Sequence, residues 1–162
     1  MTGKVEARID ELGLVLPAPL QIPPGLDVPL VMVKIVGTRV IVSGHGPQEE
    51  DGSIAQPLGQ VGSDLTVEQG TEAARKTALA MVGTLQRELG DLDRIKIWVK
   101  VLGMVNSAPG FNQQVSVING FSNTIIDIFG RECGMAARSA VGMAHLPFSI
   151  PVEVEAELEL YE

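Results

Sequence analysis

The sequence predicts an α+β domain in which two helices cover one face of a mixed β-sheet. Strand-like and helix-like segments follow one another along the 162 residues in the order hairpin, helix, strand, helix, strand, strand. In the closing segment, apolar residues from Val152 to Leu160 alternate with glutamates, so one side of this strand is apolar and the other carries carboxylates. If both helices lie on one face, the other face is either wet or covered by another subunit.

The first 29 residues are expected to form an N-terminal extension, and residues 30–162 a single domain. Residues 5–14 have the apolar spacing of a short helix. Prolines then recur up to Pro29, where they remove backbone donors and fix φ, so residues 16–28 are expected to be an extended connection. This connection is able to lie along the surface of a neighbouring subunit.

The sheet is expected to begin with a hairpin over residues 30–43, because this run is β-branched and apolar. Gly37 and Thr38 interrupt the run and mark the turn between its two strands. The segment Gly44-His45-Gly46-Pro47 ends the hairpin, and residues 48–62 are expected to form a loop with a short strand near Ile54.

Two helices and the remaining strands follow. Thr66-Val67-Glu68-Gln69 has the form of a capping box, and apolar residues recur at helical spacing up to Leu89 before Gly90. Residues 95–102 are expected to form a strand, and residues 112–129 a second helix that also ends at a glycine. The two final strands complete the domain.

Composition limits the classes of function. The formal net charge is -8, with 20 acidic and 12 basic residues and no stripe of lysines and arginines, so nucleic acid is not an expected partner. The chain has no apolar run of the roughly 20 residues that crossing a bilayer requires, and its N-terminus does not resemble a signal peptide. The single cysteine, Cys133, fits a reducing compartment, so we expect a cytoplasmic protein.

Arg138 is the main candidate for a functional residue. It lies in a small, apolar, strand-like run, where its permanently charged guanidinium needs a carboxylate, a carbonyl or an anionic ligand. A site for a small carboxylate would satisfy it, and so would a position at a strand edge, where it would reach solvent or pair with a nearby glutamate.

Glu153 is the second candidate, because it begins the final strand beside Pro151, although a solvated strand face also explains it. In a direct hairpin centred on Phe148, Arg138 would lie opposite a residue near Leu158 and could not meet Glu153. Either another strand intervenes between the two, or they come together from different subunits.

Other reactive residues give weaker signals. His45 lies between two glycines, which suit either a ligand site or simply a turn. His145 is isolated in a loop, and no spacing typical of metal ligands is present, so we expect no metal. Cys133 is expected to be a spectator thiol.

The C-terminal quarter resembles the signature of the YjgF/Rid family of reactive-intermediate deaminases. The resemblance rests on Ala137-Arg138-Ser139-Ala140-Val141, Leu146-Pro147 and Val152-Glu153-Val154-Glu155-Ala156. Ile41-Val42-Ser43-Gly44 and Val117-Ile118-Asn119 are similar to family features that lie upstream.

The resemblance implies a chorismate-mutase-like fold assembled as a trimer, with a barrel of sheets inside, helices outside and clefts between subunits. It further implies hydrolysis of enamines and imines such as 2-aminoacrylate to 2-keto acids and ammonia, with no cofactor and no metal. Arg138 would bind the substrate carboxylate and Glu153 would orient the attacking water. The residues lining the cleft would be Ser43, Gly44, Asn119, Leu30, Ala140 and His45.

This chain departs from the deaminase subgroup at two positions. Leu30 stands where the subgroup has a tyrosine, and Ala140 where it has a cysteine, so the cleft should be more apolar. A non-catalytic trimer that binds a small carboxylate is therefore the alternative. The ribonuclease activity attached to the family name fits poorly with an acidic chain.

Overall fold

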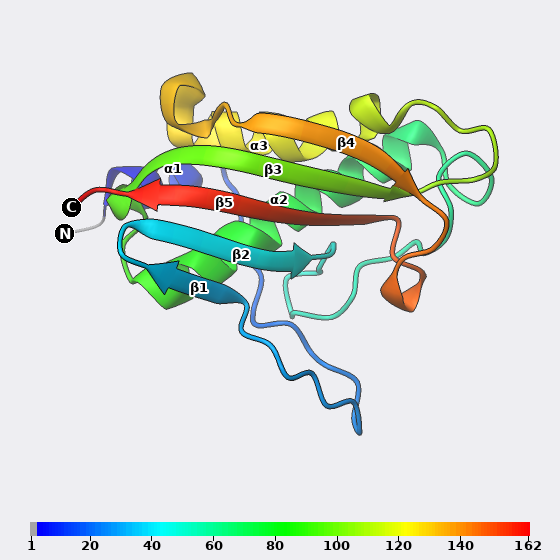
Figure 1. The fold of residues 1–162 in the computed structure, drawn as a ribbon, viewed down its shortest axis with the longest axis horizontal. Coiled ribbons are helices and arrows are strands. Elements are labelled where there is room, and N and C mark those ends of the chain that lie inside the picture. The colour runs from blue at the N-terminus through cyan, green and yellow to red at the C-terminus, as the bar shows by residue number, and fades with distance from the viewer. Residues whose placement is uncertain (1–2) are drawn as a thin grey trace.

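A computed structural model describes residues 3–162 (Figure 1). The helices are α1 (Lys4–Glu11), α2 (Val67–Leu89) and α3 (Gln114–Gly134). The strands are β1 (Val33–Val36), β2 (Arg39–His45), β3 (Ile95–Asn106), β4 (Ala137–Met143) and β5 (Val152–Leu160), and two 3-10 turns are η1 (Leu92–Arg94) and η2 (Pro147–Ser149). The predicted α+β class and the order of its elements are confirmed.

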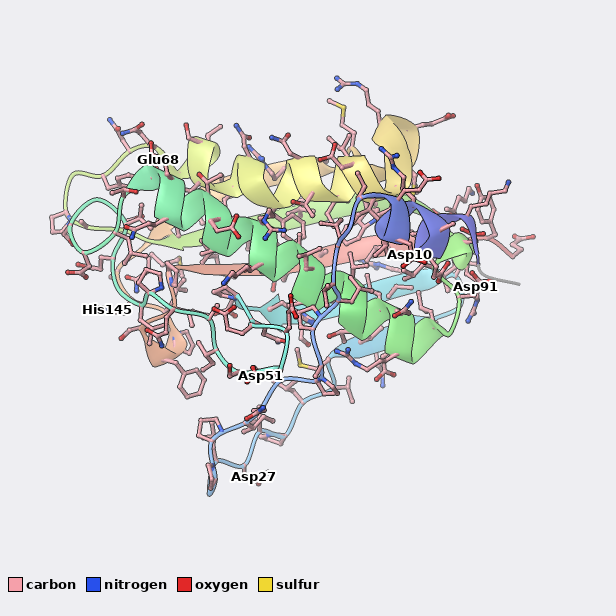
Figure 2. All side chains as sticks on the ribbon, turned by 180° about the vertical axis from the view of Figure 1, so that it is seen from behind. Asp10, Asp27, Asp51, Glu68, Asp91 and His145 are labelled. Atoms are coloured by element: carbon pink, nitrogen blue, oxygen red, sulfur yellow. The ribbon has the colours of Figure 1, made fainter. Side chains whose placement is uncertain are left out.

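The five strands form one mixed sheet in the order β1-β2-β5-β3-β4. β3 and β4 are parallel, whereas the other neighbouring pairs are antiparallel. A parallel pair needs a crossover connection, and α3 supplies it. Both long helices lie on the same face of the sheet, as predicted (Figures 1 and 2).

The alternation along β5 assigns the two faces. Val152, Val154, Ala156, Leu158 and Leu160 are buried beneath the helices. The intervening glutamates lie on the face opposite the helices, which we call the open face. The predicted apolar and acidic sides of this strand are therefore confirmed.

Local signals fix the ends of the helices. The capping box of α2 is present, since the Thr66 hydroxyl accepts from the Gln69 amide and the Gln69 side chain accepts from the Thr66 amide. Gly90 ends α2 in the left-handed region, at φ 77°. In α3 the helical backbone breaks at Gly130, at φ 78°, and a last turn follows.

Several predicted boundaries are wrong: α3 runs from Gln114 to Gly134 instead of 112–129, and β2 continues to His45 instead of ending at residue 43. The strand predicted to end at residue 102 continues to Asn106, because β4 and β5 flank its C-terminal half and hydrogen-bond with it. The hairpin begins at Val33, since the Leu30 amide donates to the Val28 carbonyl instead of joining the sheet. The N-terminal helix ends at Glu11, just before Gly13 adopts φ 64°.

The N-terminal extension packs on the domain for much of its length. α1 contacts α3, and Arg87 of α2 donates to the Pro17 carbonyl at 2.9 Å. Beyond Ala18 the chain projects from the body as an arm and returns to start β1 (Figure 1). Across residues 3–162, no helix combines the length and apolarity needed to span a bilayer.

Candidate active site

A β-bulge places Gly44 against Glu153. β2 and β5 pair through Val42 with Ala156 and His45 with Val154, so two residues of β2 face one residue of β5 between these pairs. The bulge turns Gly44 toward the carboxylate, and a Cβ added to Gly44 would collide with the Glu153 Oε1. The missing side chain of Gly44 is therefore what lets the Glu153 carboxylate fold over the backbone.

The environment of Glu153 favours its protonated form more than water would. Burial raises the pKa of this carboxyl above its ordinary value, and the negative charge of Glu155 raises it further. No lysine or arginine of the described chain comes within salt-bridge distance of Glu153. A half-buried carboxyl with a raised pKa is suited to proton transfer.

Ser43, the other half of the bulge, binds the returning end of the arm. Its amide donates to the Met32 carbonyl at 2.9 Å, and its hydroxyl donates to the Val31 carbonyl at 2.7 Å. Leu30 lies just beyond this anchor and is 54% exposed. Ser43, Gly44 and Glu153 thus form one cluster, with Leu30 at its margin.

Arg138 lies in a second cluster, on the face covered by α3. It pairs in register with Val101, which is buried beneath the helices. One guanidinium nitrogen, Nη1, donates to Asn119 Oδ1 at 3.1 Å and to Ser122 Oγ at 3.0 Å. Asn119 and Ser122 share one side of α3 because they are three residues apart.

Only part of the guanidinium is occupied. Within residues 3–162, Nη1 is the only nitrogen of Arg138 that donates a hydrogen bond, and no carboxylate pairs with it. Burial lowers the pKa of Arg138, but a guanidinium remains charged at any working pH. The Nε and Nη2 groups are thus free to donate hydrogen bonds to both oxygens of a carboxylate.

The two clusters lie apart within one protomer. β3 separates β4 from β5, so a strand does intervene between Arg138 and Glu153, but it does not bring them together. Along β3, Arg138 is level with Val101 and Glu153 with Met104, a stagger of about 10 Å in addition to two strand spacings of about 4.8 Å each. The two side chains also leave opposite faces of the sheet. A small substrate cannot touch both within one copy.

His45 faces away from Glu153, into the core. The ring is 1% exposed. Its Nδ1 donates to the Ser43 carbonyl at 2.7 Å, and its Nε2 lies 3.0 Å from the Thr84 hydroxyl of α2. Burial lowers the pKa of His45, and the charge of Arg87 lowers it further. A neutral ring in this position braces the backbone of the bulge.

The remaining candidates are spread over the fold. Ala140 is half-buried on the same face as Arg138, two residues along β4. Cys133 is half-buried, and burial raises the pKa of its thiol, so its thiolate is disfavoured. His145 is exposed in the loop after β4, and Figure 2 places it at the end of the molecule opposite Asp91.

Among residues 3–162, one group of carboxylates lies close enough together to hold a cation, at the end of the molecule that carries Asp91. Ligand oxygens of Glu6, Asp91 and Asp93 come within 4.8 Å of one another. Backbone amides already engage all three side chains: Leu92 donates to Glu6, Lys4 and Val5 donate to Asp93, and the amide of Asp93 donates to Asp91. The geometry identifies them as caps of α1 and η1.

Sequence reasoning missed Ser122 as a partner of Arg138. A hydroxyl three residues after Asn119, on the same side of the helix, was the available signal. The surface hollows do not mark the site either. A hollow of about 610 Å³ lies between α1, α3 and the C-terminus, and one of about 260 Å³ lies on the open face beside Glu155 and Lys100. Neither contains Arg138 or Glu153.

Comparisons with known proteins identify the family. The model of the family described as "YjgF/chorismate mutase-like, putative endoribonuclease" matches residues 13–154, so the match begins inside the N-terminal extension. Protein TCP17 of Trypanosoma cruzi is 43% identical over 159 residues, which cover 98% of this chain and 96% of that protein.

Solved structures agree. The crystal structure of Atu1372 from Agrobacterium tumefaciens, a protein of unknown function, is 39% identical with a TM-score of 0.86 and covers 97% of this chain and 92% of its own. A Shewanella oneidensis protein described as a "putative endoribonuclease" is 28% identical with a TM-score of 0.85, covering 96% of this chain and 99% of its own. The chain with this sheet, this bulge and this arginine therefore belongs to the YjgF/chorismate mutase-like family.

Proposed function

We propose that copies of this chain assemble as a trimer and that each cleft between two copies hydrolyses a small enamine or imine carboxylate, such as 2-aminoacrylate. The products are a 2-keto acid and ammonia, and the reaction uses no cofactor and no metal. One observation carries the proposal: the free donor edge of Arg138 and the half-buried carboxylate of Glu153 lie on opposite faces of one protomer. A second copy is needed to bring such groups together.

The open face of the sheet supports assembly. Large apolar side chains alternate there with the glutamates of β5, and each is more than a third exposed. These side chains are Ile41, Ile97, Val141 and Met143. A sheet face of this composition is suited to contact with another copy of the chain. Apolar contacts would then surround the glutamates and raise the pKa of Glu153 further.

The reaction needs few groups from the protein, namely a proton acceptor and an anchor for the substrate carboxylate. In the enamine case, a proton from solvent adds to the terminal carbon and gives the iminium, whose C=N carbon is electrophilic. The Glu153 carboxylate accepts a proton from water as the water oxygen bonds to that carbon. The carbinolamine nitrogen then takes the proton back from Glu153, and the C–N bond breaks to release ammonia as the hydroxyl loses its proton to solvent and becomes the keto oxygen. Arg138 holds the carboxylate of the substrate in place throughout.

A trimer that binds a small carboxylate without turning it over is the second candidate. Leu30 favours it, because the position that carries a tyrosine in the deaminase subgroup here presents an exposed apolar side chain. Ala140 likewise offers no reactive atom. Both candidates use Arg138 as the anchor, so they differ in turnover and not in binding.

The deciding experiment generates 2-aminoacrylate in the assay and follows release of the keto acid. We expect the wild type to accelerate it and Arg138→Ala to lose roughly 10- to 100-fold in kcat/KM, the value of a charge-assisted hydrogen-bond pair. Arg138→Lys should recover only part of the loss, since an ammonium lacks the planar fork. Arg131→Ala, which removes an exposed arginine of α3, is the matched control and should leave the rate unchanged.

The outcomes separate the two candidates. Binding of pyruvate that depends on Arg138, without turnover of any imine, would establish the binding protein and refute the hydrolase.

The acidic character of the chain argues against RNA as substrate, because the net charge is -8 and the lysines and arginines form no stripe along the sequence. We therefore expect no cleavage of RNA by the purified protein, and we place it in the cytoplasm on the evidence of its single cysteine.

A further inference from the structure

The arm, residues 19–31, is the most exposed part of the described chain. All of its residues are exposed except the half-buried Val28. Five of them are large and apolar, with exposures between 38% and 57%: Leu20, Ile22, Leu26, Leu30 and Val31. Figure 2 shows Asp27 at the tip, well away from the helices and the sheet. A soluble domain rarely presents such a run of apolar side chains without a partner for them.

Both ends of the arm are fixed to the body. At the outgoing end, the Ala18 amide donates to the Glu50 carbonyl and the Gln21 amide to the Gly52 carbonyl, each at 2.9 Å. The Gln21 side chain adds a bond to the Asp51 carbonyl at 2.8 Å. At the returning end, Ser43 binds the carbonyls of Val31 and Met32. The arm therefore projects in a defined direction.

Composition indicates what the arm contacts. Asp27 is its only charged residue, so the arm offers no electrostatic attraction to nucleic acid or to a lipid headgroup. Prolines 23, 24 and 29 fix φ, which lowers the entropy lost when the arm is immobilised against a partner. An apolar, nearly neutral and partly rigid segment is suited to the surface of a protein.

The returning end of the arm starts at the candidate site itself. Ser43, which anchors it, is adjacent to Gly44, and Gly44 carries the Glu153 carboxylate against its backbone. In the proposed assembly, the copy that completes this site with its Arg138 cluster lies next to the point where the arm rejoins the body. The partner surface is thus continuous with the base of the arm.

We infer that the arm docks on a second copy of this chain, across the mouth of the cleft between the two copies. The inference rests on the proposed function for the location of that cleft. Leu30 and Val31 then form one wall of the cleft, while Ile22 and Leu26 pack on the neighbouring copy. The arm thereby restricts the cleft to small substrates and shields it from water.

Cross-linking tests the contact directly. A photoreactive amino acid replaces Leu26 at the arm, and isotopically labelled and unlabelled chains are refolded together. We expect cross-links that join a labelled to an unlabelled chain. The same residue at Glu88, exposed on α2, is the control and should give none. Cross-links from Leu26 that stay within one chain, or none at all, would overturn the inference.

Substitutions give a second, quantitative test. Ile22→Ser combined with Leu26→Ser leaves the protomer intact, because both side chains are exposed in it, and should raise the dissociation constant of the assembly about tenfold or more. Gly52→Ala should act in the same direction, since its φ is +86° and a Cβ there would strike the Pro19 carbonyl. Val15→Ser, at a 52% exposed position outside the arm, should change nothing.

Different results would refute the proposed hydrolase activity and the proposed contact of the arm. Arm cross-links between copies that turn over no imine would refute the hydrolase and leave the arm contact standing. Hydrolysis that depends on Arg138 in an assembly whose dissociation is unaffected by the arm substitutions would refute the arm contact alone.

Discussion

The contact between Gly44 and Glu153 leads to a quantitative prediction for Gly44→Ala. The φ of Gly44 lies outside the left-handed region, so alanine is compatible with the backbone there. The new Cβ would strike Oε1 of Glu153 and approach its Cδ to 3.0 Å and its Cγ to 3.2 Å. Overpacking of this kind costs about 1–3 kcal/mol of unfolding free energy. Because the carboxylate is only half-buried, it can swing toward solvent, so we expect a cost near 1 kcal/mol.

A double-mutant cycle isolates that cost. Glu153→Ala removes all three crowding atoms, so in this background Gly44→Ala should cost nothing, or even stabilise by about 0.4–1 kcal/mol by restricting the unfolded chain. The expected coupling is therefore about 1–2 kcal/mol. Urea denaturation of the four proteins at one fixed protein concentration measures it, since assembly makes stability depend on concentration.

The control for this cycle is Gly83→Ala. A Cβ at Gly83 meets Arg87 and the extension, not the bulge, so its effect should add to that of Glu153→Ala within about 0.5 kcal/mol. Equal costs of Gly44→Ala in both backgrounds would show that Glu153 does not lie over Gly44, and the proposed half of the site would be lost with it.

Three further predictions follow from the same structure. Because the pKa of Glu153 is raised, the folded state holds the proton of this carboxyl more tightly than the unfolded state does. The stability of Glu153→Gln relative to the wild type should therefore increase as pH rises above 4.5, the ordinary pKa, and should not change with pH below it. Denaturation curves at several pH values measure this, and a constant difference across them would contradict it. Because the pKa of His45 is lowered, the stability of the wild type should fall as pH drops below 6.5, and His45→Gln should not show this loss in thermal unfolding scans. An equal loss of stability in acid for the wild type and His45→Gln would refute the neutral buried ring. Thr66→Ala should lower the unfolding free energy by about 1 kcal/mol in urea denaturation through loss of the α2 cap, and an unchanged midpoint would mean that the cap is not formed in solution.

Much of the fold was predictable because its signals are local. The capping box at Thr66, the stop at Gly90 and the alternation from Val152 to Leu160 each depend on side chains within a few residues of one another. Periodicity reads such features directly. The boundaries that were wrong depend on contacts that sequence spacing does not contain, such as the pairing of Gly103 and Met104 with strands on both sides.

The site was predictable only in part, for the same reason. Residue chemistry singled out Arg138 and Glu153, and the family resemblance added Gly44 and Asn119, but neither gave the arrangement of these residues in space. Insertion of β3 between β4 and β5 separates the arginine from the glutamate. No local sequence pattern predicts which strand lies between two others in the sheet. Burial of His45 beneath α2 likewise depends on a helix that begins more than 20 residues later.

The position of β5 has a consequence for how the protein is made. The last strand in the sequence is the middle strand of the sheet, between β2 and β3. Before β5 has been synthesised, no backbone ladder joins the β1-β2 hairpin to the β3-α3-β4 unit. Both therefore expose apolar surface that β5 later covers. Native folding therefore waits until β5 has been synthesised. A chain cut short before β5 would leave the two parts of the sheet without a backbone ladder between them, joined only through the packing of α2.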